Sequence, residues 1–246
     1  MNPIFLYVIG ITFIASVIRS TFGFGESLVG VPLLLLCMPI ETAVPLSVLI
    51  SVVIALLVVV QDHAKIHLSS AKWLIVFAML GIPIGLIILV YGDPLLVKTV
   101  LGFLIILYAL YSLVGKGSFR LSADHKGWLF ACGFLSGVFG GAYGLNGPPL
   151  VIYGNMRRWS ATHFRATLQA YFLPASLLGI IGYFVKGLVT REVMIYFLVS
   201  LPAVIPAVFL GRYLNHKLRD DTFFKYVYVG LIVIGLVLIF DAWLKK

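Results

Sequence analysis

One carboxylate stands out among the residues that could do chemistry. Glu26 sits in the stretch 22-FGFGESLVGVP-32, between two apolar runs, and Arg19 precedes that stretch. A carboxylate in an apolar membrane setting is costly and usually functional: it carries protons, pairs with a cation or binds a coupling ion. We expect Glu26 to couple proton movement to another process. Capping a helix N-terminus or pairing with Arg19 is the structural alternative, and Arg19 itself is either an interfacial side chain or a counter-charge for a bound anion.

A second stretch, 139-FGGAYGLNGPP-149, repeats the pattern of the first. Shifting the sequence by 117 residues aligns Phe22 with Phe139, Gly23 with Gly140, Leu28 with Leu145, Gly30 with Gly147 and Pro32 with Pro149. In this register Glu26 falls on Tyr143, so the carboxylate has no equivalent in the second stretch. The repeat predicts two related halves, 1–115 and 127–246, joined by a polar linker at 116–126.

The two stretches have the residue types of an anion site. A glycine-rich break followed by a short helix exposes the first N–H groups of that helix, and helix N-termini carry partial positive charge that binds anions. Glycines that merely allow close helix packing are the alternative explanation. Gln169 begins a later helix and either reaches the same cavity or bonds to a neighbouring helix. The predicted substrate-binding residues are Gly23, Gly25, Ser27, Gly144, Asn146, Gly147, Arg19 and Gln169.

The elements that must position these residues are membrane helices. The chain has 246 residues, of which 61% are hydrophobic and 11% charged, whereas a soluble domain is about a quarter charged. About eight apolar runs approach the roughly 20 residues that a membrane span needs: 4–22, 43–60, 72–91, 97–114, 127–140, 163–185, 192–211 and 223–243. Two shorter runs, 27–38 and 145–156, follow the glycine-rich breaks and predict half-helices or re-entrant segments. The fold class is therefore an all-α polytopic membrane protein.

Charge in the loops favours one arrangement of the halves. If the short segments do not cross, each half has four spans, the halves are parallel and Lys and Arg split almost evenly between the two sides. If the short segments count as crossings, each half has five and the repeats are inverted. The basic loops 61–72, 115–127, 156–165 and 211–225 then share one side, which the positive-inside rule makes cytoplasmic. The net charge of +9 is explained by these loops, so we expect no nucleic-acid partner. We also expect no cofactor, metal or catalytic residue, because the histidines lack ligand spacing and no nucleotide-binding motif occurs.

Longer motifs resemble a known family. The first, GFGESLVGVPLLLL with ETAVPLSVLIS, and the second, YGLNGPPLVIYGNMRRWSATHFRATLQAYF, resemble the sulfite exporter TauE/SafE family over essentially the whole chain. The resemblance implies a multi-pass permease of a bacterial or archaeal inner (plasma) membrane that exports sulfite and related organosulfur anions. Many members carry a run of glycines in each motif, where this chain has Phe24 and Glu26, then Ala142 and Tyr143. Glu26 is therefore a feature of a subgroup.

The leading hypothesis is a secondary transporter that exports a small oxyanion such as sulfite or an organosulfonate, with Glu26 coupling proton movement and one half rocking against the other. A passive anion channel with the same pore is the alternative, although the sequence has no ring of repeated charged residues. A membrane enzyme or assembly factor is a third hypothesis, which lacks a buried acid–base pair. The expected partners are the anion and the lipid bilayer, and a homo-oligomer stays open.

Overall fold

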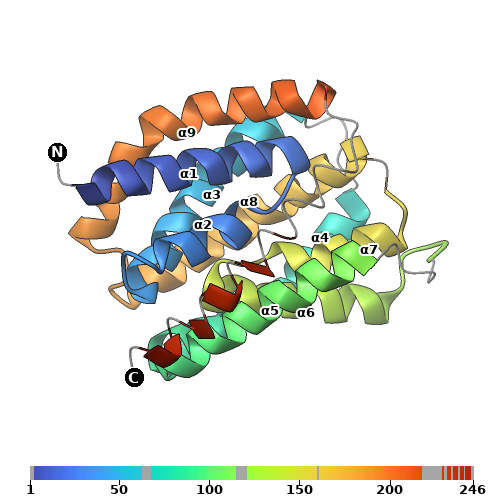
Figure 1. Cartoon of the computed structure of the whole chain (residues 1–246). Helices are drawn as coiled ribbons and strands as arrows, with labels where there is room; N and C mark the ends of the chain where they lie inside the picture. The colour runs from blue at the N-terminus through green and yellow to red at the C-terminus, as the bar shows by residue number, and fades with distance from the viewer. Residues whose placement is uncertain are drawn as a thin grey trace.

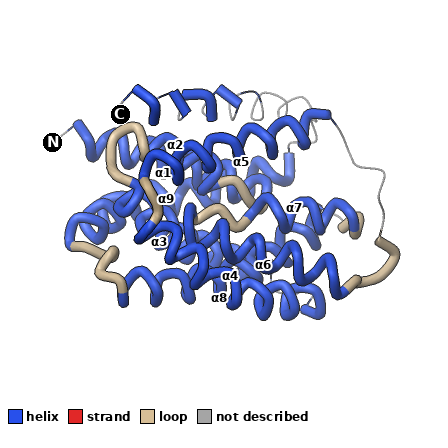
Figure 2. Tube along the Cα trace, turned by 90° about the horizontal axis from the view of Figure 1, so that it is seen from below, coloured by secondary structure: helices blue, strands red, loops and turns tan. Residues whose placement is uncertain are grey.

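The computed structural model describes residues 3–62, 68–114, 121–159 and 161–217, with residue 229 and the runs 232–233, 235–237, 239–240 and 242–244 near the C-terminus. Helices account for nearly all of these residues, and no strand occurs among them. The all-α prediction is confirmed for this part of the chain. The helices lie side by side with roughly parallel or antiparallel axes (Figures 1 and 2).

Six of the described helices are long and apolar enough to cross a membrane. They are α1 (Pro3–Phe22), α3 (Ile40–Asp62), α4 (Leu68–Tyr91), α5 (Pro94–Val114), α8 (Ala161–Val185) and α9 (Arg191–Lys217). The expected span 127–140 is helix α6 (Lys126–Tyr143), which is not among the six, and 223–243 falls partly on residues outside the described ranges. A multi-pass membrane protein is therefore confirmed, whereas the count of eight spans is not.

The two short segments are short helices, as their lengths predict. Helix α2 (Glu26–Leu34) has nine residues and α7 (Gly147–Met156) has ten. At about 1.5 Å per residue, neither is long enough to cross a hydrocarbon layer of roughly 30 Å. Helix α2 begins just after the break that ends α1, and α7 begins just after the break that ends α6. Each short helix therefore continues the chain after an interrupted helix.

The closest packing joins helices from different halves of the sequence. Helix α1 packs along α9, α4 packs along α6, and α3 meets α8 at the centre (Figure 1). We group these helices into a first body of α1, α2, α3 and α9 and a second body of α4, α6, α7 and α8, which share the extensive α3–α8 contact. The hypothesis that one half of the sequence rocks against the other stays a prediction, and each of these groups of helices contains members from both halves.

Small residues explain the tight α4–α6 contact. A Cβ added to Gly137 would lie 2.8 Å from Ala78 Cα, and one added to Gly85 would lie 2.7 Å from the backbone N of Ala142. Real side chains do not fit at these distances, so the backbones approach through glycine, as in membrane helix pairs generally. Glycine recurs every fourth position on both faces, at 81 and 85 on α4 and at 133, 137 and 141 on α6.

The flanks of the basic loops lie at one end of the bundle. The Leu121 N–H donates to Met156 O at 3.0 Å, which places the segment before α6 beside the end of α7. The Asn215 side-chain amide donates to Thr21 O, which places the end of α9 beside the end of α1. Ser70, in the first turns of α4, bonds Asp124 in the same region. We call this the basic end; its connecting residues 63–67 and 115–120 lie outside the described ranges.

Candidate functional site

Left-handed glycines create the two breaks. Helix α1 ends at Phe22 and is followed by Gly23 at φ 83° and Gly25 at φ 100°, while α6 ends at Tyr143 and is followed by Gly144 at φ 68°. A Cβ disfavours these angles, so glycine is required. The first left-handed glycine after α1 and the first after α6 are 121 positions apart (144 minus 23). A shift of 117 residues therefore aligns identical letters but does not align the two backbone turns.

The corrected register changes the equivalent of the carboxylate. Counting 121 positions from Glu26 gives Gly147, the first residue of α7, just as Glu26 is the first residue of α2. Tyr143 instead corresponds to Phe22, the last residue of α1. Glu26 therefore still has no acidic counterpart in the second break, and the difference between the breaks lies at the start of the short helices.

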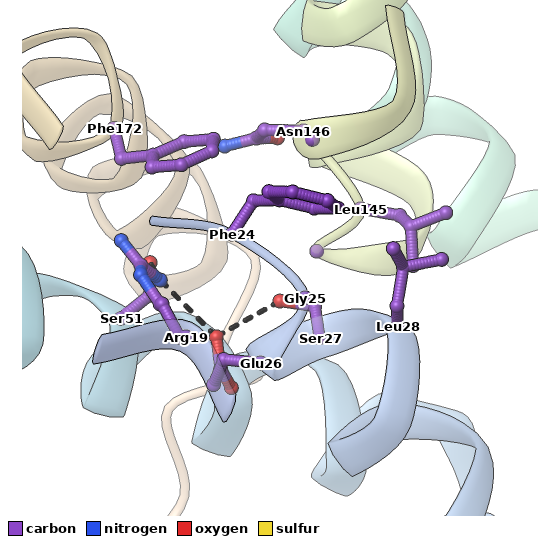
Figure 3. A pocket seen from close by; sticks show the side chains of 12 residues that line it. Arg19, Phe24, Gly25, Glu26, Ser27, Leu28, Ser51, Leu145, Asn146 and Phe172 are labelled. Carbon is purple, nitrogen blue, oxygen red and sulfur yellow. Dashed lines mark hydrogen bonds and ion pairs between the residues drawn. The ribbon is translucent and has the colours of Figure 1, made fainter. Parts of the chain in front are cut away.

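The two breaks meet in space. A Cβ added to Gly147 would lie 3.6 Å from Phe24 Cβ, and one added to Gly144 would lie 3.7 Å from Ser27 Oγ. Residues from both breaks line one central cavity between the two bodies (Figure 3). The predicted juxtaposition of the breaks is therefore observed.

A buried ion pair lies at the wall of this cavity. Arg19 Nη1 is 3.2 Å from Glu26 Oε2, and only 4% and 3% of the two side chains are exposed. Arg19 lies in the last turn of α1 and Glu26 is the first residue of α2, so the ion pair spans the first break. Figure 3 shows both side chains at the cavity. Arg19 therefore does not extend to an interface, and the alternative of an Arg19–Glu26 pair is the one observed.

Hydroxyl and amide groups complete the coordination of the pair. Ser47 Oγ donates to Glu26 Oε1 at 2.6 Å, and Ser27 Oγ donates to Oε2 at 3.0 Å. Arg19 Nη2 donates to Gln169 Oε1 at 2.9 Å, and Gln169 Nε2 donates to Gly23 O at 2.7 Å. Because Gln169 belongs to α8, this amide ties the second body to both the guanidinium and the first break.

The central cavity is small in this conformation. The volume that the centre of a water molecule can occupy is about 20 Å³. This is room for about one water molecule. The rings of Phe24 and Phe172 border it, and the Arg19 guanidinium carbon lies 4.7 Å from the Phe172 ring centre. An oxyanion larger than water therefore requires side chains to move before it can bind beside Arg19.

Asn146 supplies a polar group from the second break. Its Oδ1 atom is buried and has no hydrogen-bond partner among the described residues, and it occupies the place where a Cβ on Gly140 would stand. The amide nitrogen faces the Phe172 ring across the cavity (Figure 3). Pro148 and Pro149, in the first turn of α7, have no N–H group. Helix α2 therefore exposes more backbone donors to the cavity than α7, and the two helix starts are unequal.

The predicted site residues assemble, although several others were missed. Arg19, Gly25, Glu26, Ser27, Gly144, Asn146 and Gly147 line the cavity, whereas Gly23 and Gln169 lie behind it and hold Arg19 and the break. The lining residues that the sequence did not single out are Phe24, Leu28, Ser51, Leu145 and Phe172. Ser47 and Ser51, four positions apart on α3, place their hydroxyls toward the pair, and that spacing was the available signal.

Comparison with known proteins gives one match. The model of the family described as sulfite exporter TauE/SafE matches residues 8–238. No curated protein and no solved structure matches the chain.

Proposed function

The chain belongs to the sulfite exporter TauE/SafE family, and on that premise we propose that it is a secondary permease that exports a small oxyanion, sulfite or an organosulfonate. The observation that carries this proposal is the buried Arg19–Glu26 pair where the two breaks meet. A cation that is already buried beside helix N-termini gives an anion both a counter-charge and backbone donors. The substrate binds at Arg19, at the start of α2 and at the Asn146 amide.

The ion pair supports proton coupling through Glu26. A buried charge without a partner is strongly unfavourable, so an anion that takes Arg19 leaves Glu26 as an uncompensated carboxylate. Protonation of Glu26 removes that penalty and frees the guanidinium at the same time. The anion and a proton are therefore taken up together, and the empty site closes again when both have left.

The small size of the cavity supports a transporter over a channel. A channel conducts through a continuous wetted path, whereas here the cavity has room for about one water and the ion pair lies in its wall. Alternation between the two sides requires movement of packed units. The units that we propose are the first and second bodies, which meet mainly where α3 contacts α8.

We propose an orientation from the charges of the loops. The four basic loops begin or end at the basic end of the bundle, and cytoplasmic loops of membrane proteins are enriched in Lys and Arg. The basic end is then cytoplasmic, in the inner (plasma) membrane of a bacterium or archaeon. The matching contacts of α1 with α9 and of α4 with α6 support inverted repeats, because each pairs a helix of one half with one of the other.

The test is transport by purified protein in proteoliposomes. Labelled sulfite and organosulfonates should cross faster with the protein than without it, and an imposed pH gradient should accelerate the movement. Glu26→Gln should abolish the acceleration by the gradient, whereas Glu192→Gln, which makes the same change at a carboxylate that accepts a hydrogen bond from Tyr196 within α9, should retain it. The substrate proposal fails if the anions move no faster than in empty liposomes. The coupling proposal fails if Glu26→Gln retains the full pH response.

A further inference from the structure

A row of four aromatic rings connects the central cavity with the basic end. Phe24, which lines the cavity, meets Phe164 with ring centres 6.1 Å apart. Phe164 meets Trp159 at 6.5 Å, and Trp159 meets Tyr153 at 5.7 Å. All three contacts are edge-to-face, an attractive geometry for aromatic pairs. The row fills the space between the start of α8 and the end of α7 with hydrocarbon.

The backbone of α7 provides the seat for this row. A Cβ added to Gly154 would lie 2.6 Å from two ring carbons of Phe164 and 3.1 Å from the Trp159 ring. Only a glycine leaves room for both rings against the helix. The position of the rings therefore depends on the position of α7.

A polar cluster, the latch, fixes the end of α7. The latch consists of Ser70 on α4, Asp124 before α6, and Tyr153 and Arg157 at the end of α7. Tyr153 donates to Asp124 Oδ1 at 2.7 Å, and Arg157 Nε lies 3.0 Å from the same oxygen. Ser70 donates to Asp124 at 2.9 Å and 3.0 Å. Asp124 thus joins three helices through one carboxylate.

The latch lies between the solvent-exposed surface and the aromatic row. About a quarter of the Asp124 side chain and a fifth of the Arg157 side chain are exposed (26% and 20%), whereas Tyr153 is fully buried. At the start of α9, the similar carboxylate–tyrosine bond from Tyr196 to Glu192 stays within one helix. Both residues of that bond belong to α9, so it is a matched control for the latch.

We infer that Phe24, Phe164 and Trp159 form a gate that closes the central cavity toward the basic end, and that the latch holds this gate shut. The inference rests on the proposed function, since a permease needs a route from its site to each side. The phenyl rings of Phe24 and Phe164 offer an oxyanion no donors, so it passes only when the packed rings separate. Phe164 and Trp159 rest against Gly154 of α7, so a shift of the α7 end releases both rings.

The test measures access to the cavity directly. In a chain with Cys37→Ala and Cys132→Ala, Leu145→Cys places one thiol in the wall of the cavity, at a position that is 1% exposed. Oriented proteoliposomes are treated from each face with a membrane-impermeant thiol reagent. A Ser69→Cys chain, which has an exposed thiol at the basic end, identifies that face.

Breaking the latch should speed labelling from the basic face. Asp124→Asn and Arg157→Gln each shift the population toward the open gate, and we expect roughly a three- to ten-fold faster reaction of the Leu145→Cys thiol, the scale of one or two hydrogen bonds. Tyr153→Phe removes only the 2.7 Å bond and keeps the ring, so a smaller rise in the same direction is expected. Glu192→Gln should leave the rate unchanged.

Two outcomes overturn the inference. One is an unchanged labelling rate in Tyr153→Phe and in whichever of the two latch variants folds, judged by a single symmetric gel-filtration peak. The other is a rise seen only from the face opposite to Ser69. Labelling does not depend on transport, so the two proposals fail separately. Labelling that responds without sulfite movement contradicts the proposed permease, whereas transport without a labelling response contradicts the gate.

Discussion

Replacing Glu26 by Gln leaves Arg19 charged at a position where 4% of its side chain is exposed. Removing one partner of a buried pair costs about 3–5 kcal/mol in the free energy of unfolding, because the remaining charge has no compensation. Arg19→Met should cost a similar amount by stranding the carboxylate. For a chain of this size about 1 kcal/mol corresponds to roughly 2–4 °C, so each single variant should melt roughly 6–20 °C lower.

The double variant decides whether the pair acts as a unit. Arg19→Met with Glu26→Gln removes both charges, and replacing a buried pair by uncharged groups is often neutral or stabilising. We expect its melting temperature to lie within a few degrees of the parent, far above that of either single variant. Thermal unfolding in detergent, followed by intrinsic fluorescence and gel filtration, measures all four proteins. If the two single losses simply add in the double variant, to within about 0.5 kcal/mol, the pair is not coupled and the reasoning is refuted.

Three further predictions follow from the same structure. In Glu26→Gln the internal competitor for Arg19 is gone, so at each pH sulfite should raise the melting temperature more than in the parent, as a thermal-shift titration will show; a smaller rise would contradict competition. Gly23→Ala should lower stability by about 1–2 kcal/mol, because Gly23 has φ 83° and a Cβ there would lie 3.0 Å from a neighbouring backbone atom, whereas Gly10→Ala, with open space around it in α1, should be neutral or slightly stabilising in the same melting assay. Exposed thiols at Ser69→Cys and Lys186→Cys should react from opposite faces of oriented vesicles. Labelling of both thiols from the same face would contradict the proposal that the helix bundle crosses the membrane between them.

The membrane class and the position of the breaks follow from the local sequence. Apolar runs of about 20 residues have no stable place in water, and glycine-rich stretches between them interrupt a helix wherever they occur. For these reasons the short helices, the six long spans and the isolated carboxylate Glu26 are predictable from composition and spacing, whereas the further spans that composition suggests at 127–140 and 223–243 are not confirmed. The family resemblance also lies in short motifs, and the family match over residues 8–238 confirms it.

The register of the repeat could not be obtained from residue letters. Glycine and proline recur every few positions in both breaks, so a shift of 117 aligns more identical letters than the shift that the backbone requires. Only the φ angles show which glycines turn the chain, Gly23 and Gly25 in the first break and Gly144 in the second, and the helix ends and starts on either side set the shift of 121. Backbone geometry therefore decides which residues are equivalent, and similarity of letters does not.

Within the site, the sequence by itself determined which charges are present, and the tertiary structure alone decided what they meet. Glu26 must find a partner in an apolar setting, and that requirement is local. Whether the partner is Arg19, and whether Gln169 holds that guanidinium from 150 residues away, depends on α8 packing against α3 and on both breaks meeting between two bodies. Those bodies mix the two halves of the chain, because the close glycine contact of α4 with α6 and the packing of α1 with α9 outweigh proximity along the sequence.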